Sequence, residues 1–163
     1  MTAGYAWCHP SAMRAALRFF AVLLLGASIA ASACGGDDDS APVEVSLVYP
    51  IADMTGFRPV QRTLPAGADP LPAALELLLA GPTADERASA GVVNPFPPGT
   101  RLLGVSRQGD TVTVDLSADV LGYGGGSAAV LAIEGAISRT VSAIVPGAET
   151  RILVEGQPDR LQP

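Results

Sequence analysis

The clearest alternation of polar and apolar residues in the chain lies between residues 100 and 117. In the second half of this stretch every second residue is apolar, namely Val112, Val114 and Leu116. A period of two is typical of a strand that buries one face. The preceding dipeptide, Gly109-Asp110, suits a type II′ turn, so the pattern predicts a tight antiparallel hairpin. Leu103 and Val105 of the first strand are expected to fill the same apolar face.

A first helix is predicted where leucines recur with helical spacing: Leu71, Leu75, Leu78 and Leu79. Asp69 is a suitable N-cap, and Pro70 fits the first helical position because an N–H there would have no helical partner. Gly81 and Pro82 end the helix. The leucines share one side of the helix, which we expect to face the core rather than a partner.

A longer helix is predicted from near Ser127 to the dipeptide Pro146-Gly147. Its apolar residues again fall on one side: Val130, Ile133, Ile137, Val141 and Ile144. A glycine in the middle of a helix costs about 1 kcal/mol relative to alanine. Gly135 is therefore expected to mark a place where the helix packs closely on the sheet.

The remaining segments are shorter. Residues 43–51, 57–64 and 151–155 have the composition of extended segments, residues 83–90 hold a short helical turn, and residues 118–126 form a glycine-rich loop. The elements thus follow in the order strand, extended segment, helix, hairpin, helix and strand. This order predicts an α+β fold with a βαββαβ-like core, in which two helices pack on one face of a mainly antiparallel sheet.

The first part of the chain has the layout of a bacterial signal peptide. Arg14 and Arg18 precede an apolar run, residues 19–30, that is short for a membrane span. Small residues follow and end at Ala33 and Cys34, a sequence that resembles the lipobox of bacterial lipoproteins. We expect cleavage between Ala33 and Cys34 and a covalent lipid on Cys34. An ordinary secretory signal peptide and an uncleaved anchor are the alternatives.

This layout divides the chain into four parts. Residues 1–33 are the signal peptide, with Met13 as an alternative start; residues 34–42 are the lipidated cysteine and an acidic tether; residues 43–157 are the folded domain; and residues 158–163 are a tail. The tether contains three aspartates at positions 37–39. We interpret them as a solvated run that keeps the domain off an anionic lipid surface, not as a metal site.

The charge of the chain bears on its partners. The 163 residues include ten arginines, no lysine and 16 acidic residues, a formal charge of −6. Removal of residues 1–33 takes away two arginines and no acidic residue, which leaves −8. Because nucleic-acid binding depends on neutralising phosphates, no nucleic-acid partner is expected.

Few side chains suited to catalysis follow the predicted cleavage site. The single histidine, His9, precedes this site, and Cys34 is the expected lipid anchor, so neither histidine nor thiol chemistry is expected. The carboxylates of Asp110, Asp115 and Asp119 are the candidates for a glycosidase. We interpret them instead as polar residues of the turn, the strand and the loop.

A glycine-rich stretch precedes the second long helix and consists of Gly122, Tyr123, Gly124, Gly125 and Gly126. Glycines before a helix can form an anion site, but this stretch has no adjoining cationic residue. A mobile connection is the preferred interpretation. Tyr123 at its centre is an aromatic side chain suited to contact with another protein, which makes this stretch the candidate contact loop.

Several segments, taken in order, resemble the GerMN domain, a family of sporulation and spore germination domains. They are LVYP at residues 47–50, PVQRTL at 59–64, LELLLAGP at 75–82, PPGTRLLGV at 97–105, GDTVTVDLS at 109–117, Thr140, and TRILVEG at 150–156. The resemblance implies an extracytoplasmic domain, often found on lipoproteins. It also implies similarity to ring-building domains that assemble in secretion and sporulation complexes, and no known catalytic residues.

We therefore expect a non-catalytic module that is lipid-anchored at the extracytoplasmic face of the cell membrane and docks an envelope protein or assembles with itself. No metal or cofactor is expected apart from the lipid on Cys34. A lipoprotein that binds the cell wall or a small molecule is the alternative, and a carboxylate-dependent glycosidase is the third hypothesis.

Substitution of the anchoring cysteine tests this assignment. Cys34→Ala is expected to leave the protein unprocessed or to shift it out of the detergent-extractable lipoprotein fraction, because the thiol that accepts the lipid is gone. Immunoblots of fractionated cells report both properties. Unchanged processing and membrane retention in the variant would refute the lipoprotein assignment.

Overall fold

A computed structural model of the chain describes residues 41–124, 126–158 and 160–161. The chain divides into two units, Met1–Gly36 and Asp37–Pro163, and the described residues all belong to the second. The predicted signal peptide, its cleavage site at Ala33 and Cys34, the three aspartates of the tether and Gly125 lie outside the described residues.

The elements follow in the order β1 (Val43–Pro50), β2 (Phe57–Leu64), α1 (Pro70–Ala80), α2 (Ala84–Ala90), β3 (Leu102–Gln108), β4 (Thr111–Leu116), the 3₁₀ helix η1 (Ala118–Gly122), α3 (Gly126–Ile144), β5 (Glu149–Val154) and β6 (Gln157–Pro158). They form two sheets, a β1–β2 ribbon and a sheet in the order β3-β4-β5-β6. Strands β4 and β5 run parallel and the other pairs antiparallel. The α+β class is confirmed, whereas the single sheet is wrong because β1 and β2 form a ribbon of their own.

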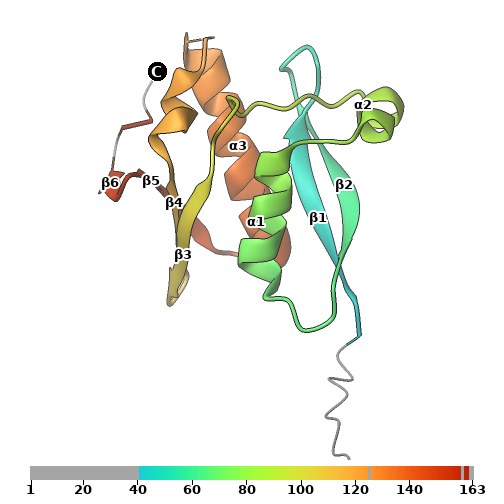
Figure 1. Cartoon of the computed structure of the whole chain (residues 1–163), viewed down its shortest axis with the longest axis vertical. Helices are drawn as coiled ribbons and strands as arrows, with labels where there is room; N and C mark the ends of the chain where they lie inside the picture. The colour runs from blue at the N-terminus through green and yellow to red at the C-terminus, as the bar shows by residue number, and fades with distance from the viewer. Residues whose placement is uncertain (1–40, 125, 159, 162–163) are drawn as a thin grey trace, which may run out of the picture. The chain divides into compact units, whose positions relative to one another are not determined.

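Helices α1 and α3 lie between the two sheets (Figure 1). They pack on one face of the larger sheet, as predicted, and the β1–β2 ribbon covers their other side. The buried residues of α3 accordingly occupy a broad arc of its surface: Val130, Ala132, Ile133, Ala136, Ile137, Thr140 and Val141. By length and composition α3 is apolar enough to span a membrane, and its packing between two sheets accounts for that composition.

In the β3–β4 hairpin the predicted buried face of β4 is confirmed, whereas the prediction that Leu103 of β3 is buried is wrong. Val112, Val114 and Leu116 are fully buried, and Gly109 has the positive φ of 60° that the turn requires. Leu103, however, is 49% exposed. The register shifts between Leu102 and Gly104, so Leu102 rather than Leu103 lies opposite Leu116. A bulge of this kind turns the following side chain to the other face.

The predicted boundaries near the C-terminus also need correction. Pro158 pairs with Leu153 in β6, and Leu161 is only 7% exposed and belongs to the core. Pro158 and Leu161 are therefore part of the domain instead of a tail, because the apolar side chain of Leu161 covers the core. Helix α3 begins at Gly126, so Ser127 lies inside the helix and is not its N-cap. Much of the predicted glycine-rich loop is the 3₁₀ helix η1.

Helix α2 is held on the β1–β2 ribbon by an ion pair. Thr83 and Glu86 form a capping box at the start of α2. The Nε and an Nη of Arg62 on β2 donate to the two carboxylate oxygens of Glu86 over 2.7 and 2.6 Å. The hydrogen bonds from Arg62, aided by the backbone N–H of Thr83, lower the pKa of Glu86 from its usual 4.5 to about 2.

Tyr49 connects β1 with the last turn of α1. Its hydroxyl donates to the carbonyl oxygens of Leu77 and Leu78 over 3.2 and 3.3 Å. The ring is fully buried, and this burial raises the pKa of Tyr49 to about 12. The polar end of an otherwise apolar side chain is therefore satisfied by carbonyls at the C-terminal end of α1, where Leu78 also accepts from the N–H of the cap residue Gly81.

Replacement of Glu86 by Gln tests the ion pair. We expect the free energy of unfolding at pH 7 to fall by about 1–3 kcal/mol, because charge-assisted hydrogen bonds are lost. The folded pKa is about 2, below the usual 4.5, so the carboxylate stabilises the fold above pH 4.5 and this contribution disappears as the pH falls towards 2. Urea unfolding of both proteins from pH 7 to pH 2 should show the difference shrinking with acid. A difference that stays constant would contradict the assignment.

Candidate functional site

The candidate site lies where α3 meets β1, at the strand edge that does not pair with β2. The backbone N–H of Val48 donates to Oγ1 of Thr140 on α3 over 2.9 Å, and both residues are buried. Nearby, the carbonyl of Pro50 accepts from the N–H of Val93 over 2.9 Å. These bonds satisfy backbone groups that would otherwise be buried without partners, and the Thr140 bond fixes α3 beside β1.

Strand β2 contributes two side chains to the same region. Pro59 lies opposite Val48 in the ribbon. Because the Val48 N–H points towards Thr140, this pair exchanges no ladder hydrogen bonds, and a proline fits there without loss. Phe57 lies two residues earlier, so its side chain emerges on the same face of the ribbon as Pro59.

The ring of Phe57 rests directly on the backbone of α3 at Gly135. A Cβ on Gly135 would lie 2.3 Å from Cζ of Phe57, closer than real atoms approach. The predicted close contact of this glycine is therefore confirmed, with β2 as the partner. The glycine provides the space in which an aromatic ring can seat on a helix.

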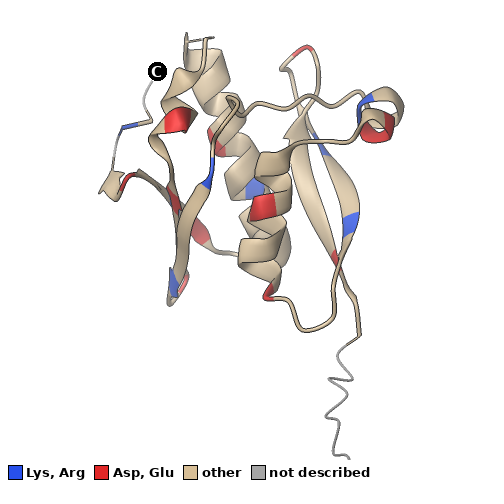
Figure 2. Ribbon diagram, viewed as in Figure 1, with Lys and Arg blue, Asp and Glu red and all other residues tan. Residues whose placement is uncertain are grey.

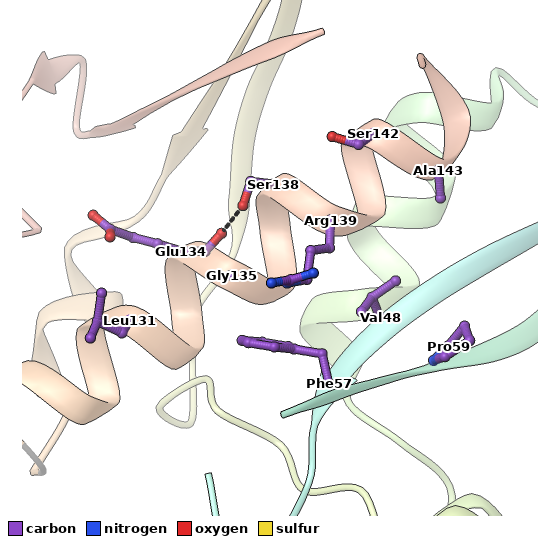
Figure 3. A pocket seen from close by; sticks show the side chains of 10 residues that line it. All are labelled: Val48, Phe57, Pro59, Leu131, Glu134, Gly135, Ser138, Arg139, Ser142 and Ala143. Carbon is purple, nitrogen blue, oxygen red and sulfur yellow. Dashed lines mark hydrogen bonds between the residues drawn. The ribbon is translucent and has the colours of Figure 1, made fainter. Parts of the chain in front are cut away.

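Arg139 of α3 lies over a face of the same ring. Its guanidinium carbon lies 4.7 Å from the centre of the Phe57 ring, a cation–π contact. Gly135 and Arg139 are four positions apart on α3, about one helical turn, so they lie on the same side of the helix. The guanidinium and the Phe57 ring thus form a stack beside Gly135, which Figure 3 shows from close by.

An open groove of about 850 Å³ surrounds this stack. Its lining comes from β1, β2 and α3 and consists of Val48, Phe57, Pro59, Leu131, Glu134, Gly135, Ser138, Arg139, Ser142 and Ala143 (Figure 3). A smaller hollow of about 150 Å³ shares Phe57 and Leu131 with it and adds Met54. Leu131 is 64% exposed and Met54 48%. We call these two adjoining spaces the α3 groove.

The apolar end of the α3 groove lies far from the point where the domain begins. Met54 is in the turn that follows β1, whereas Val43 starts that strand. Eight residues of extended strand span roughly 26 Å, and Figure 1 shows the turn and the start of β1 at opposite ends of the β1–β2 ribbon. A tether that enters at Val43 therefore leaves Met54 and Leu131 at the far end.

The candidate contact loop takes a different form from that predicted. Tyr123 is half-buried and packs against the core instead of projecting fully into solvent. Gly122 ends η1, and Gly122, Gly124 and Gly126 are exposed. The role of this loop in contacts stays a prediction.

The three aspartates of the glycosidase hypothesis each have a structural role. Asp110 lies in the hairpin turn, where its carbonyl accepts from the N–H of Glu149 over 2.8 Å. Asp115 accepts from the N–H of Gly156 over 2.9 Å, and Asp119 accepts from the hydroxyl of Ser117 over 2.9 Å. The carboxylates of Asp115 and Asp119 therefore hold neighbouring backbone and side chain in place.

Other chemistry is sparse in the part of the chain that the structure describes. No group of three or more His, Cys, Asp or Glu side chains there is arranged to hold a metal ion. Arginines and acidic residues are spread over the helices and both sheets (Figure 2). The α3 groove, with its exposed leucine and its single arginine, is thus the most distinctive surface feature.

Fold and site together describe a small α+β domain whose two long helices lie between two sheets and whose longest helix leaves one side open. The family model for sporulation and spore germination domains, Germane, matches residues 45–160. The chain belongs to this family, which confirms the resemblance to GerMN domains. Comparison with curated protein sequences gives no significant match.

Solved structures give the same result for the fold. The tandem GerMN domains of the sporulation protein GerM from Bacillus subtilis match with a TM-score of 0.56 at 18% identity, over 76% of this chain and 41% of that one. This chain therefore spans less than half of the tandem structure. The first GerMN domain of the same protein matches with a TM-score of 0.51 at 20% identity, over 71% of this chain and 85% of that one.

Sequence reasoning identified Gly135 as a close contact but missed the groove around it. Phe57 and Arg139 are separated by 82 positions, and nothing in their local sequence links them. The available signal was the mid-helix glycine together with the exposed position of Leu131 beside a buried helical face.

The close contact between Gly135 and Phe57 is tested by substitution. Gly135→Ala is expected to lower the free energy of unfolding by about 1–3 kcal/mol, since the new methyl group meets the ring. This loss occurs although alanine favours helix by about 1 kcal/mol. In a Phe57→Ala background the same substitution should become neutral or stabilising. A double-mutant cycle measured by denaturant unfolding checks this, and additive effects would show that ring and glycine are independent.

Proposed function

We propose that this chain is a non-catalytic, lipid-anchored module at the extracytoplasmic face of the cell membrane, which binds an envelope protein or a second copy of itself through the α3 groove. The observation that carries the proposal is the open side of α3, where Leu131 is 64% exposed beside the Phe57–Arg139 stack. Exposed apolar side chains next to an arginine and an aromatic ring are typical of protein-binding surfaces.

The position of the groove supports this proposal. With an anchor on Cys34, the tether enters the domain near Val43, at the end opposite Met54. The apolar end of the groove then points away from the membrane. A surface placed in this way is accessible to a protein of the envelope, whereas it is poorly placed for insertion into the lipid that holds the anchor.

A second candidate function is the binding of a small molecule or a cell-wall fragment. It is favoured by a more enclosed hollow of about 390 Å³ between α3, β5 and β6. Glu134, Ser138 and Arg151 contribute to its lining, and Oγ1 of Thr150 is buried there without a hydrogen-bond partner among the described residues. Buried hydroxyls are normally paired, so a polar ligand that reached this atom would supply its missing partner.

Site-specific photo-cross-linking tests the first candidate. A photoreactive phenylalanine derivative at position 131 of the full lipoprotein is expected to give a recurrent adduct with one envelope protein, or a dimer, after irradiation of intact cells. Position 103 is the matched control, because Leu103 is also an exposed leucine but lies on β3. Mass spectrometry identifies the adducts.

The result against the proposal is equally specific. An anchored, folded protein that gives no adduct from position 131, or the same adducts from positions 131 and 103, would refute the α3 groove as the contact surface. An increase in melting temperature with muropeptides, combined with the absence of adducts, would favour the ligand-binding function instead.

A further inference from the structure

The chemistry of the α3 groove defines the kind of partner segment that it binds, and this inference rests on the proposed function. We propose that Arg139, held by its stack on Phe57, binds the carboxylate of an aspartate or glutamate in the partner protein, and that apolar side chains next to this acidic residue occupy the groove on either side of Arg139.

The first argument is that the charge of Arg139 is not used within the described part of the chain. The ion pair there is formed by Arg62 and Glu86, whereas the contact of Arg139 is with the Phe57 ring. The groove also contains Glu134, but Figure 3 shows its carboxylate pointing away from Arg139. The guanidinium is therefore available to a carboxylate from outside.

The second argument is that the guanidinium is already held in place. It lies over the Phe57 ring, and the tip of that ring is seated against the backbone of α3 at Gly135. The N–H groups at the edge of a stacked guanidinium remain free to donate two parallel hydrogen bonds to a carboxylate. A side chain ordered before binding loses less conformational entropy on binding, which raises affinity.

The third argument concerns the walls of the groove and decides the class of partner. Val48 and Pro59 line one side of the stack, and Leu131 lies at its other end (Figure 3). Apolar walls on both sides of a cation match a peptide in which apolar side chains flank an acidic one. A glycan would stack on an open aromatic face, and the face of Phe57 beneath Arg139 is not open.

Substitutions of Arg139 distinguish a purely structural role, covering the Phe57 ring, from the proposed role in binding a carboxylate. If the side chain only covered the ring, an apolar side chain of similar length would serve equally well. Arg139→Met keeps the cover and removes the charge, so it should leave the melting temperature unchanged while it weakens binding. Arg139→Lys keeps the charge but loses the planar fork, and it should bind with intermediate affinity.

The experiment uses random dodecapeptides displayed on phage, selected on the full-length protein in detergent micelles. Enriched peptides are expected to share an Asp or Glu with an apolar residue within two positions of it. Synthetic versions, measured by fluorescence anisotropy, should bind Arg139→Met at least about tenfold more weakly than wild type. Arg107→Met is the matched control, because it removes an exposed arginine on β3, away from the groove. It should change affinity by less than about twofold.

Four outcomes would overturn the inference: enriched peptides without a carboxylate, equal affinity for wild type and Arg139→Met, Arg139-dependent binding of phosphatidylglycerol vesicles or muropeptides in place of peptides, or an Arg139-dependent dimer. Failure here is distinguishable from failure of the proposed function. An adduct from position 131 that persists in Arg139→Met would keep the groove as a contact surface and remove only the carboxylate site.

Discussion

The domain depends on how α3 completes the unpaired edge of β1. A buried strand edge leaves backbone groups without partners, and each such group costs free energy comparable to a lost hydrogen bond. Here the hydroxyl of Thr140 accepts from Val48, and the segment after α2 supplies the N–H of Val93 to Pro50. The Thr140 bond determines where α3 runs relative to the ribbon, and the Val93 bond holds the segment after α2 at the same edge. The β1–β2 ribbon can then form one outer layer without pairing to the larger sheet, and α1 and α3 occupy the space between the two.

The same docking creates the candidate site. A helix that packs at the edge of a ribbon leaves an open corner between its outer side and the ribbon face. Small residues on α3, above all Gly135, allow Phe57 to reach the helix backbone, and Arg139 closes over the ring. Packing therefore fixes two side chains that are well suited to recognition, while Leu131 and Met54 remain exposed along the same corner. Stability and binding share these residues, which is why variants that keep packing but remove charge separate the two roles.

The local sequence pattern predicted caps and buried side chains correctly where these depend on one helix or strand alone. Asp69 does cap α1, and the period-two residues Val112, Val114 and Leu116 are buried as their alternation indicates. The same pattern predicted burial less well where the burial of a side chain depends on neighbouring elements. Leu103 is apolar and lies in a strand, but the register shift in the hairpin turns it towards solvent. Leu161 is a single leucine near the chain end, and only its position over the core shows that it belongs to the domain.

The sequence by itself determined the α+β class, both long helices and the hairpin, because each follows from periodicity, caps and turn residues that act over a few positions. The family was indicated by the resemblance of several segments in order and is confirmed by the family model. The sequence also indicated that Gly135 makes a close contact. The tertiary structure alone decided that the strands form two sheets, that Thr140 completes the edge of β1 and that Phe57 and Arg139 meet on α3. Phe57 and Arg139 are 82 positions apart in the sequence, and Val48 and Thr140 are 92 positions apart. Contacts of this kind depend on how whole elements pack, and no local pattern of residues encodes them.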